Sequence, residues 1–317
     1  AVFFAAQKIE RIQAAFASHP DRNRWEAQEK RERKQACQRE KRLWLTLALT
    51  AVFGLLIVLK YANFAIDNAN VLLGRPEGTG RVDWLLPLGI SFYTFQALSY
   101  LIDIYRGKNH GAERFSDFLL YICMFPKMAQ GPIVRYEQIA PQLTQRRTNP
   151  RMIFDGILRF ATGLAKKVLL ADYAGKVISD LASDPAGLTF LGAWLSAFLF
   201  LFQIYFDFSG YTDMAIGIGR IFGFRYPENF DLPYVSTSIT EFWRRWHMTL
   251  GSFFRDYVYI PLGGNRQGKA RQILNLLVVW ALTGLWHGAS WNFVLWGLYF
   301  FLLLAIEKQI MPKLERM

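Results

Sequence analysis

The segment LWLTLALTAVFGLLIVLKYANF (residues 43–64) is apolar along its whole length, and Lys60 is its single charged residue. About 20 consecutive apolar residues in a helix are enough to cross the hydrocarbon core of a bilayer. Only helices and closed barrels satisfy their backbone polar groups in lipid, and this segment lacks the alternating pattern of a barrel strand. It therefore predicts a membrane-spanning helix.

Four further apolar runs have a similar character, at residues 84–102, 188–206, 273–286 and 291–306. The chain has 317 residues, of which 52% are hydrophobic and 16% aromatic. A soluble domain of this size would not usually gather its apolar residues into runs near the length of a membrane span. We therefore expect an all-α, polytopic transmembrane protein.

Basic residues precede the first apolar run and contribute to a net charge of +12. They are Arg22, Arg24, Lys30, Arg31, Arg33, Lys34, Arg39, Lys41 and Arg42, and glutamates are interleaved with them. Positive charge beside a span is typical of a cytoplasmic flank, and the mixed charges favour ion pairs between residues four apart on a helix. We divide the chain into a basic amphipathic cytoplasmic arm (1–42) and a transmembrane core (43–317), and we disfavour nucleic-acid binding.

Two segments of the core are too polar for lipid and too apolar for water. Residues 118–143 carry three prolines and a glycine within apolar sequence. Such breakers at membrane depth are tolerated where protein or a water-filled cavity surrounds them, which favours a re-entrant segment. Residues 155–172 are amphipathic and predict a helix along the cytoplasmic interface, with Lys166 and Lys167 on a solvated face.

A polar stripe occurs in the segment 198–224, where Gln203, Asp207, Gly210 and either Met214 or Asp213 recur at helical spacing. Such a stripe must face other helices or a cavity. Packing between helices through glycine, with Asp207 bonded to a neighbour, and a cavity-lining role are left as equal alternatives.

Two of the four histidines lie in unusual surroundings. His287 lies in ALTGLWHGASWNF (281–293), where a buried polar ring without a partner would cost about 1–3 kcal/mol. Gly288 and Ala289 permit close approach by backbone or ligand. An imidazole away from water is expected to be neutral, the form that accepts a proton in general-base catalysis.

The second unusual histidine, His247, lies in TSITEFWRRWHMTLGSFFRDYVYIPLGG (237–264), whose apolar residues from Ile239 to Tyr257 recur at roughly helical spacing and give one aromatic face. Two histidines forty positions apart, without a cysteine cluster, give no case for a metal site. Cys37 and Cys123 lie in different kinds of segment and predict no disulfide.

These residues also carry a family resemblance. The motifs FWRRWH (242–247) and LWHG (285–288), with the segments 87–107, 125–143 and 203–266, resemble the membrane-bound O-acyltransferase family. They are most similar to its bacterial branch of alginate O-acetyltransferases and of D-alanyl-transfer proteins of teichoic acid modification. The resemblance implies a multi-pass protein of the bacterial cytoplasmic membrane, with further helices before and after this chain.

The family uses two histidines near a tunnel through the membrane, which fall on His247 and His287 in this sequence. The resemblance implies transfer of an acyl group, most simply acetyl, from a cytoplasmic thioester to a hydroxyl outside the membrane. His287 is expected to be the general base and His247 to have a supporting role. The expected wall of the channel is Trp243, Trp246 and Trp286, with Asp207 and Asn229 as polar supports.

No tightly bound cofactor is expected, because acetyl-CoA or an acyl carrier thioester would be the donor substrate. The expected acceptor is an exopolysaccharide such as alginate, a teichoic acid, or an extracytoplasmic SGNH-type partner. Three alternatives stay open: D-alanyl transfer from a carrier protein, a transporter or flippase without acyl chemistry, and a scaffold that recruits a separate transferase. A transporter would account equally well for broken helices and a polar stripe.

Overall fold

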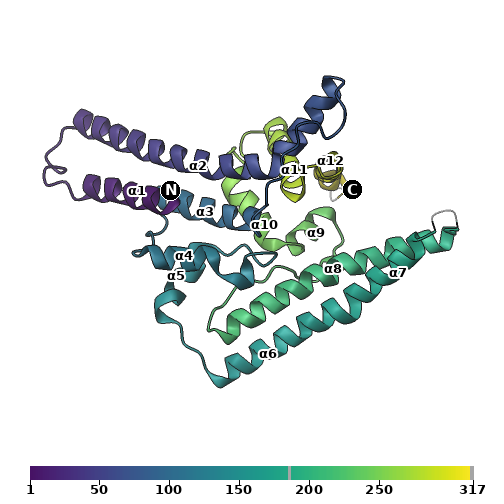
Figure 1. Cartoon of the computed structure of the whole chain (residues 1–317). Helices are drawn as coiled ribbons and strands as arrows, with labels where there is room; N and C mark the ends of the chain where they lie inside the picture. The colour runs from purple at the N-terminus through teal and green to yellow at the C-terminus, as the bar shows by residue number, and fades with distance from the viewer. Residues whose placement is uncertain (185–186, 315–317) are drawn as a thin grey trace. The chain divides into compact units, whose positions relative to one another are not determined.

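The computed structural model describes residues 1–184 and 187–314, and every regular element within them is helical (Figure 1). This confirms the all-α fold class. The chain forms two compact units. The first unit comprises Ala1–Cys123, Arg135–Glu137 and Phe253–Met317, and the second comprises Met124–Val134 and Gln138–Ser252.

Three of the described helices are long and apolar enough to cross a membrane: α2 (Ala27–Leu72), α8 (Phe190–Ile221) and α12 (Trp291–Leu314). Few side chains in their apolar segments are buried in the protein, and many are exposed. Exposed apolar surface of this extent is incompatible with water and fits contact with lipid. Three of the five predicted spans are therefore confirmed by length and composition.

The other two predicted spans do not meet these length and composition criteria and stay predictions. The run 84–102 becomes a helix only at α3 (Ile90–Tyr105), after Gly89 in the left-handed region (φ 75°), so this helix has 16 residues. Most of its side chains are buried by protein. The run 273–286 lies in α11 (Lys269–His287), which has 19 residues but carries Lys269 and Arg271 in its first turn, with Asn275 buried one turn further on.

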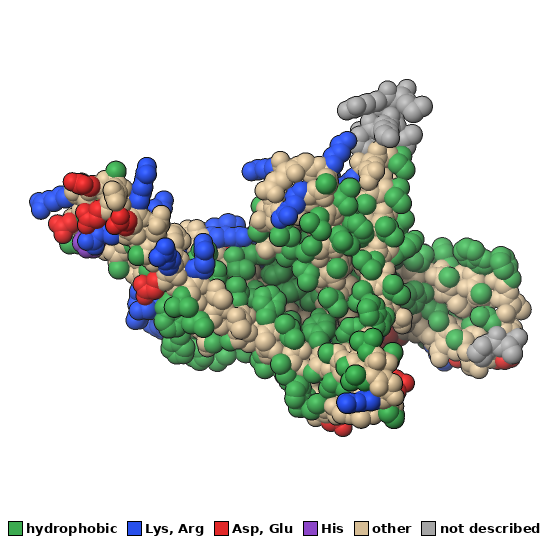
Figure 2. All heavy atoms as spheres, turned by 90° about the horizontal axis from the view of Figure 1, so that it is seen from above, with side chains coloured by type: hydrophobic (Ala, Val, Ile, Leu, Met, Phe, Trp, Pro, Cys, Tyr) green, Lys and Arg blue, Asp and Glu red, His purple; other side chains and the backbone are tan. Residues whose placement is uncertain are grey.

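The first unit begins with a hairpin of α1 (Val2–Ala17) and α2, and both helices pack on α3. Lys, Arg, Asp and Glu side chains gather at the turn of this hairpin (Figure 2). Arg33 donates to Glu29 across 2.9 Å, which confirms pairing between residues four apart. The proposed boundary between residues 42 and 43 lies inside α2, so the basic arm and the first span are parts of one continuous helix.

The segment between the second and third predicted spans is broken into short helices. They are α4 (Phe115–Cys123), the 3₁₀ turn η1 (Phe125–Lys127) and α5 (Tyr136–Gln145). Pro126 lies at the start of η1 and Pro132 in the irregular stretch before α5, where a missing backbone donor is tolerated, whereas Pro141 lies inside α5. Re-entry into a membrane stays a prediction.

The second unit is built on a pair of antiparallel helical segments. One consists of α6 (Pro150–Ala165), the π-helical η2 (Lys166–Ala171) and α7 (Asp172–Ala182), and the other is α8. Glycines set their separation: a Cβ atom at Gly163 would lie 2.5 Å from the carbonyl oxygen of Gly210. Backbones can approach this closely only without side chains between them, as in small-residue packing of membrane helices.

Ion pairs complete this helix pair and qualify one expectation. Lys166 contacts Asp213 across 2.6 Å, and Lys167 contacts Asp207 across 2.5 Å. Both lysine side chains are partly exposed, so the predicted solvated face holds in part, but α8 supplies a carboxylate to each. The polar stripe of α8 packs against the neighbouring helical segment, as the first of the two alternatives proposed.

Candidate functional site

His287 is the last residue of α11, and its side chain is exposed. Its Nδ1 donates to the carbonyl oxygen of Thr283 across 2.8 Å. A carbonyl oxygen can only accept, so Nδ1 must carry the proton, and in the neutral ring the lone pair is on Nε2. The bond thus selects the tautomer whose accessible nitrogen can act as a base.

Aromatic rings surround this imidazole. The Trp286 ring lies 4.9 Å away at 89°, and the Trp296 ring lies 4.7 Å away at 56°. Gly288 is needed here for space, since a Cβ atom on it would lie 2.2 Å from the Phe293 ring. The close approach expected at Gly288 is therefore an approach by this ring.

Two side chains of α2 hold the end of α11. Tyr61 donates its hydroxyl to the carbonyl oxygen of Leu285 across 2.7 Å, and the Lys60 ammonium donates to that of Trp286. Lys60 also donates to Ser91 Oγ across 3.2 Å. The last carbonyls of a helix have no partner inside it, and a cation there is favoured by the helix dipole. Sequence reasoning missed this role, although Lys60 is the one charge in residues 43–64.

Trp286 packs on α3 as well as on His287. Its ring lies 5.5 Å from Phe92 and is stacked at 5.7 Å on Phe95. The side chain is half-buried in this cluster, which fixes the position of the residue before His287. Its role as a channel wall stays a prediction.

His247 separates α9 (Ile239–Arg245) from α10 (Met248–Phe254), so the helical spacing of this segment is interrupted at the histidine. His247 has φ 46°, in the left-handed region that a residue with a side chain rarely adopts, and its side chain is 3% exposed. Such a conformation costs about 1–3 kcal/mol and persists when the surroundings hold it.

Asn229 supplies the contacts that hold this break. Its side chain is completely buried, and its Oδ1 accepts from His247 Nδ1 (3.0 Å), Thr249 Oγ1 (2.8 Å) and the Thr249 backbone nitrogen (3.2 Å). The Asn229 carbonyl accepts from the Met248 backbone nitrogen across 2.9 Å. Asn229 thus lies beside His247, as expected of a polar support, and it fixes the fold of the loop as well.

Aromatic residues also enclose His247. The Phe208 ring stands perpendicular to the imidazole at 4.8 Å. Trp246 is buried between Phe230 (5.1 Å) and Phe242 (5.6 Å). Trp243 is half-buried, with its ring 5.1 Å from Phe242.

Asp207 lies apart from this cluster. Although it precedes Phe208 in the chain, its carboxylate contacts Lys167 of η2 rather than His247. A role for Asp207 in helix packing thus has contacts to support it, whereas its role as a polar support of the channel stays a prediction.

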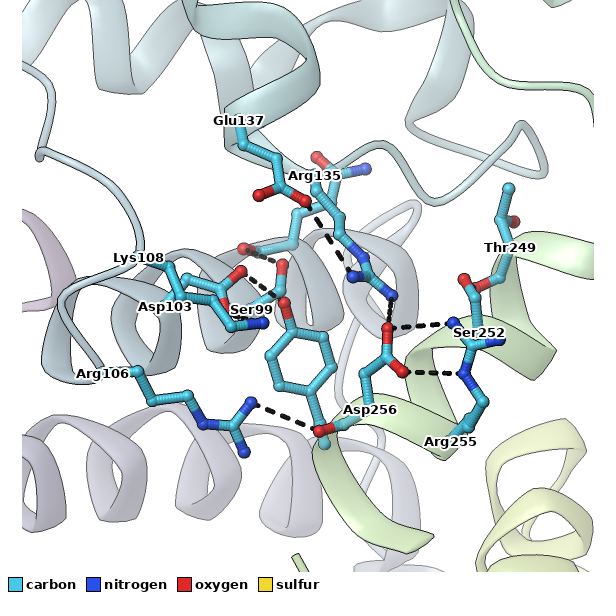
Figure 3. A network of polar contacts seen from close by, with 12 residues as sticks. Ser99, Asp103, Arg106, Lys108, Arg135, Glu137, Thr249, Ser252, Arg255 and Asp256 are labelled. Carbon is cyan, nitrogen blue, oxygen red and sulfur yellow. Dashed lines mark hydrogen bonds and ion pairs between the residues drawn. The ribbon is translucent and has the colours of Figure 1, made fainter. Parts of the chain in front are cut away.

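An ion-pair network in the first unit was missed by sequence reasoning (Figure 3). Arg135 lies between Asp256 (2.6 Å) and Glu137 (4.0 Å), and Tyr257 donates to Asp103 across 2.5 Å. Burial raises the pKa of the Asp256 carboxyl, but hydrogen bonds from Arg255 and Arg135 outweigh burial and bring that pKa below its ordinary value. These residues are far apart in the sequence, so no local pattern could have joined them.

The fold and the two sites define a helical membrane protein in which two imidazoles are each oriented by an oxygen acceptor and contacted by aromatic rings. Residues 114–317 match the model of the MBOAT, membrane-bound O-acyltransferase family. The chain belongs to this family, which confirms the resemblance inferred from the motifs.

Curated relatives extend the match towards the N-terminus. The chain is 43% identical over 282 residues to the probable alginate O-acetylase AlgI of Azotobacter vinelandii, covering 88% of this chain and 55% of the relative. It is 38% identical to the peptidoglycan O-acetyltransferase of Helicobacter pylori (84% and 56% covered) and 29% identical to the teichoic acid D-alanyltransferase of Bacillus subtilis (67% and 56% covered). The chain spans about half the length of these relatives.

Proposed function

We propose that this chain supplies the transfer site of a membrane O-acyltransferase. The enzyme would move an acyl group, most simply acetyl, from a cytoplasmic thioester to a hydroxyl on an extracytoplasmic polymer or partner protein of the SGNH type. The observation that carries the proposal is the bond from His287 Nδ1 to the Thr283 carbonyl, because it leaves Nε2 of an exposed imidazole as a proton acceptor.

In the proposed reaction the acceptor hydroxyl oxygen attacks the thioester carbonyl carbon while His287 Nε2 takes the hydroxyl proton. The carbon–sulfur bond then breaks, and the departing thiolate receives that proton from the imidazolium. A thioester is already activated, so the protein must chiefly align the reactants and move one proton. His247, fixed by Asn229, has a positioning role in this proposal.

Acetyl transfer is favoured over D-alanyl transfer by the relatives. Proteins named O-acetylase or O-acetyltransferase match at 38–46% identity, whereas those named teichoic acid D-alanyltransferase match at 28–29%. A carrier-bound D-alanyl donor is the second candidate, since it would use the same proton transfer.

The test uses the whole protein in membranes, supplied with acetyl-CoA and a polysaccharide acceptor, and measures both free thiol and new ester. His287→Ala should lower both about 10²–10⁴-fold, the usual contribution of a positioned general base. The matched control is His110→Ala, since that ring is exposed and contacts Glu10 in the first unit. Undiminished transfer by His287→Ala would refute the assignment, and transport of intact substrate without thiol release would indicate a transporter.

A further inference from the structure

A cavity of about 530 Å³ lies in the first unit, between α1 and the charged part of α2. This volume is within the range of about 300–1,000 Å³ found for small-molecule pockets. Part of its lining is apolar and includes Ile12, Ala15 and Phe16, and the charged part includes Lys8, Arg11 and Arg33. None of these residues is used in the proton transfer described above.

Basic side chains outnumber acidic ones in this lining. Glu40 is the carboxylate among the lining residues, and Lys8 contacts it across 3.9 Å with both side chains about half exposed. An exposed pair of this kind is worth about 0–1 kcal/mol and leaves both groups free to rearrange. Arg33 donates to Glu29 across 2.9 Å, and Arg11 adds a further positive charge. The cavity therefore favours an anion.

Arg11 is the cation best suited to bind that anion. Within the described residues its guanidinium has no hydrogen bond or ion pair. Arginine presents its N–H donors in a planar fork that matches the oxygens of a phosphate. Lys8 lies three residues before Arg11, so the two side chains share one face of α1. One phosphate group can thus contact both cations.

Exposed apolar side chains mark where the lipid-facing surface of the hairpin begins. Phe4 of α1 is 68% exposed, and Leu43 and Leu47 of α2 are 56% and 54% exposed. Toward the turn of the hairpin, charged residues replace them, from Lys8 onward on α1 and before Leu43 on α2. The contact between Lys8 and Glu40 places these two boundaries at the same level. The cavity therefore begins where the apolar surface ends.

Distances along α2 place the near part of the cavity at the depth of lipid headgroups. Glu40 and Cys37 precede Leu43 by three and six residues, about 4.5 and 9 Å at 1.5 Å per residue. The headgroup region extends about 5–7.5 Å beyond the hydrocarbon core on each side of a bilayer. Cys37 Sγ contacts the Ile12 carbonyl across 3.9 Å, so Arg11, the preceding residue, lies close to this level.

We propose that this cavity binds the phosphate of an anionic membrane phospholipid through Arg11 and Lys8. The acyl chains of the lipid would lie along the exposed apolar side chains of Phe4 and Leu43. A choline headgroup would bring a positive charge of its own against Arg33, so phosphatidylglycerol is expected to bind more tightly than phosphatidylcholine. Basic segments beside membrane helices attract anionic lipids in general, and the cavity adds a defined position for one headgroup. This inference does not depend on the proposed function.

The experiment measures equilibrium binding of short-chain phosphatidylglycerol to the whole protein in neutral detergent, with phosphatidylcholine of the same chain length as the reference. Arg11→Gln removes the main proposed contact and no existing hydrogen bond. We expect it to bind phosphatidylglycerol about tenfold more weakly, as for the loss of one hydrogen bond to a charged group. The matched control is Arg31→Gln, which removes the same charge from an exposed residue outside the cavity and should bind as wild type does.

Three results of the binding measurement would overturn the inference. Equal losses in Arg11→Gln and Arg31→Gln would show that the arm attracts anionic lipid through its overall charge. Equal affinity of the wild type for glycerol 3-phosphate and for phosphatidylglycerol would assign the cavity to a soluble phosphate compound. Equal affinity for phosphatidylglycerol and phosphatidylcholine would show that the cavity does not select an anion.

Cys37 provides a second measurement, because this half-buried thiol lines the cavity. In a Cys123→Ser background, which removes the other cysteine, phosphatidylglycerol should slow alkylation of Cys37 by a maleimide. The protection should be lost in Arg11→Gln and kept in Arg31→Gln. Binding of phosphatidylglycerol without any protection of Cys37 would place the lipid elsewhere and contradict the assignment.

Discussion

The two histidine sites differ in how each ring is held. His247 is 3% exposed, has a left-handed backbone conformation and is bonded to a side-chain amide that also organises the surrounding loop. His287 ends a regular helix, is exposed, and is bonded to a backbone carbonyl of its own helix. A buried ring tied to the loop fold is suited to fixing geometry, whereas an accessible ring at a helix end is suited to exchanging a proton. The predictions below separate these two roles.

The largest effect is expected at His287. Its replacement by alanine should remove about 10²–10⁴-fold of activity while leaving the thermal unfolding midpoint within a few degrees of wild type, because the exposed ring makes one hydrogen bond. Activity and unfolding measured on the same preparation check this. A large fall in the midpoint would show that His287, like His247, is needed to hold the local structure.

At Asn229, in contrast to His287, we expect a large loss of stability together with the loss of activity. Replacement by alanine removes an acceptor shared by His247 and Thr249, and should destabilise the protein by about 3 kcal/mol through the buried donors that it leaves unpaired. The thermal unfolding midpoint and the activity should both fall. Asn229→Asp, which keeps the acceptor, should recover part of the stability. Wild-type stability in the alanine variant would show that the loop does not depend on this contact.

A smaller effect is expected at Gly288. Alanine there would place a methyl group against the Phe293 ring and displace either that ring or the chain after His287, at a cost of about 1–3 kcal/mol. We expect about a tenfold loss of activity with a modest loss of stability. Gly54→Ala is the control, since no atom lies within 4 Å of a Cβ built there. Equal behaviour of the two variants would contradict the steric explanation.

The smallest effect is expected in the Arg135–Asp256 network, which involves neither histidine. Asp256→Asn should cost about 1–2 kcal/mol of stability, because the pair is not fully buried. Since the folded pKa of Asp256 lies below its ordinary value of 3.8, this stability is present above about pH 4 and is lost as the pH falls further. The difference in the free energy of unfolding between pH 7 and pH 3 should be smaller in the variant than in wild type.

The sequence predicted the parts of this molecule that depend on local composition. Apolar runs located α2, α8 and α12, because the length of an uncharged run is itself the physical requirement for a span. The same criterion failed at α3, where Gly89 delays the start of the helix and protein covers the apolar side chains. Apolar content alone does not distinguish burial in lipid from burial in protein.

The site was predicted less completely, for a related reason. The motifs pointed to His247 and His287, and Asn229 was expected as a polar support of the channel. Its contact with His247, and the left-handed break there, come from hydrogen bonds between distant residues that override helical spacing. The lysines of η2 were expected to face solvent, because a lysine paired across helices has the same local sequence as a solvated one. The contacts of Lys60 likewise depend on a residue more than 200 positions away.

The π-helical segment η2 has a consequence for changes in chain length. A π turn accommodates one residue more than an α turn, and each residue of an α-helix rotates the next by about 100°. Deleting one residue from Lys166–Ala171 would remove the additional residue and restore α geometry there, so α7 would keep its rotation about the helix axis and Gly175 would stay beside Gln203, which a Cβ on Gly175 would approach to 2.6 Å. The same deletion within α6 would turn the helical residues after it by about 100°. A single deletion in this stretch should therefore be tolerated better than one in α6, because only the π turn contains the additional residue whose loss leaves α7 in phase.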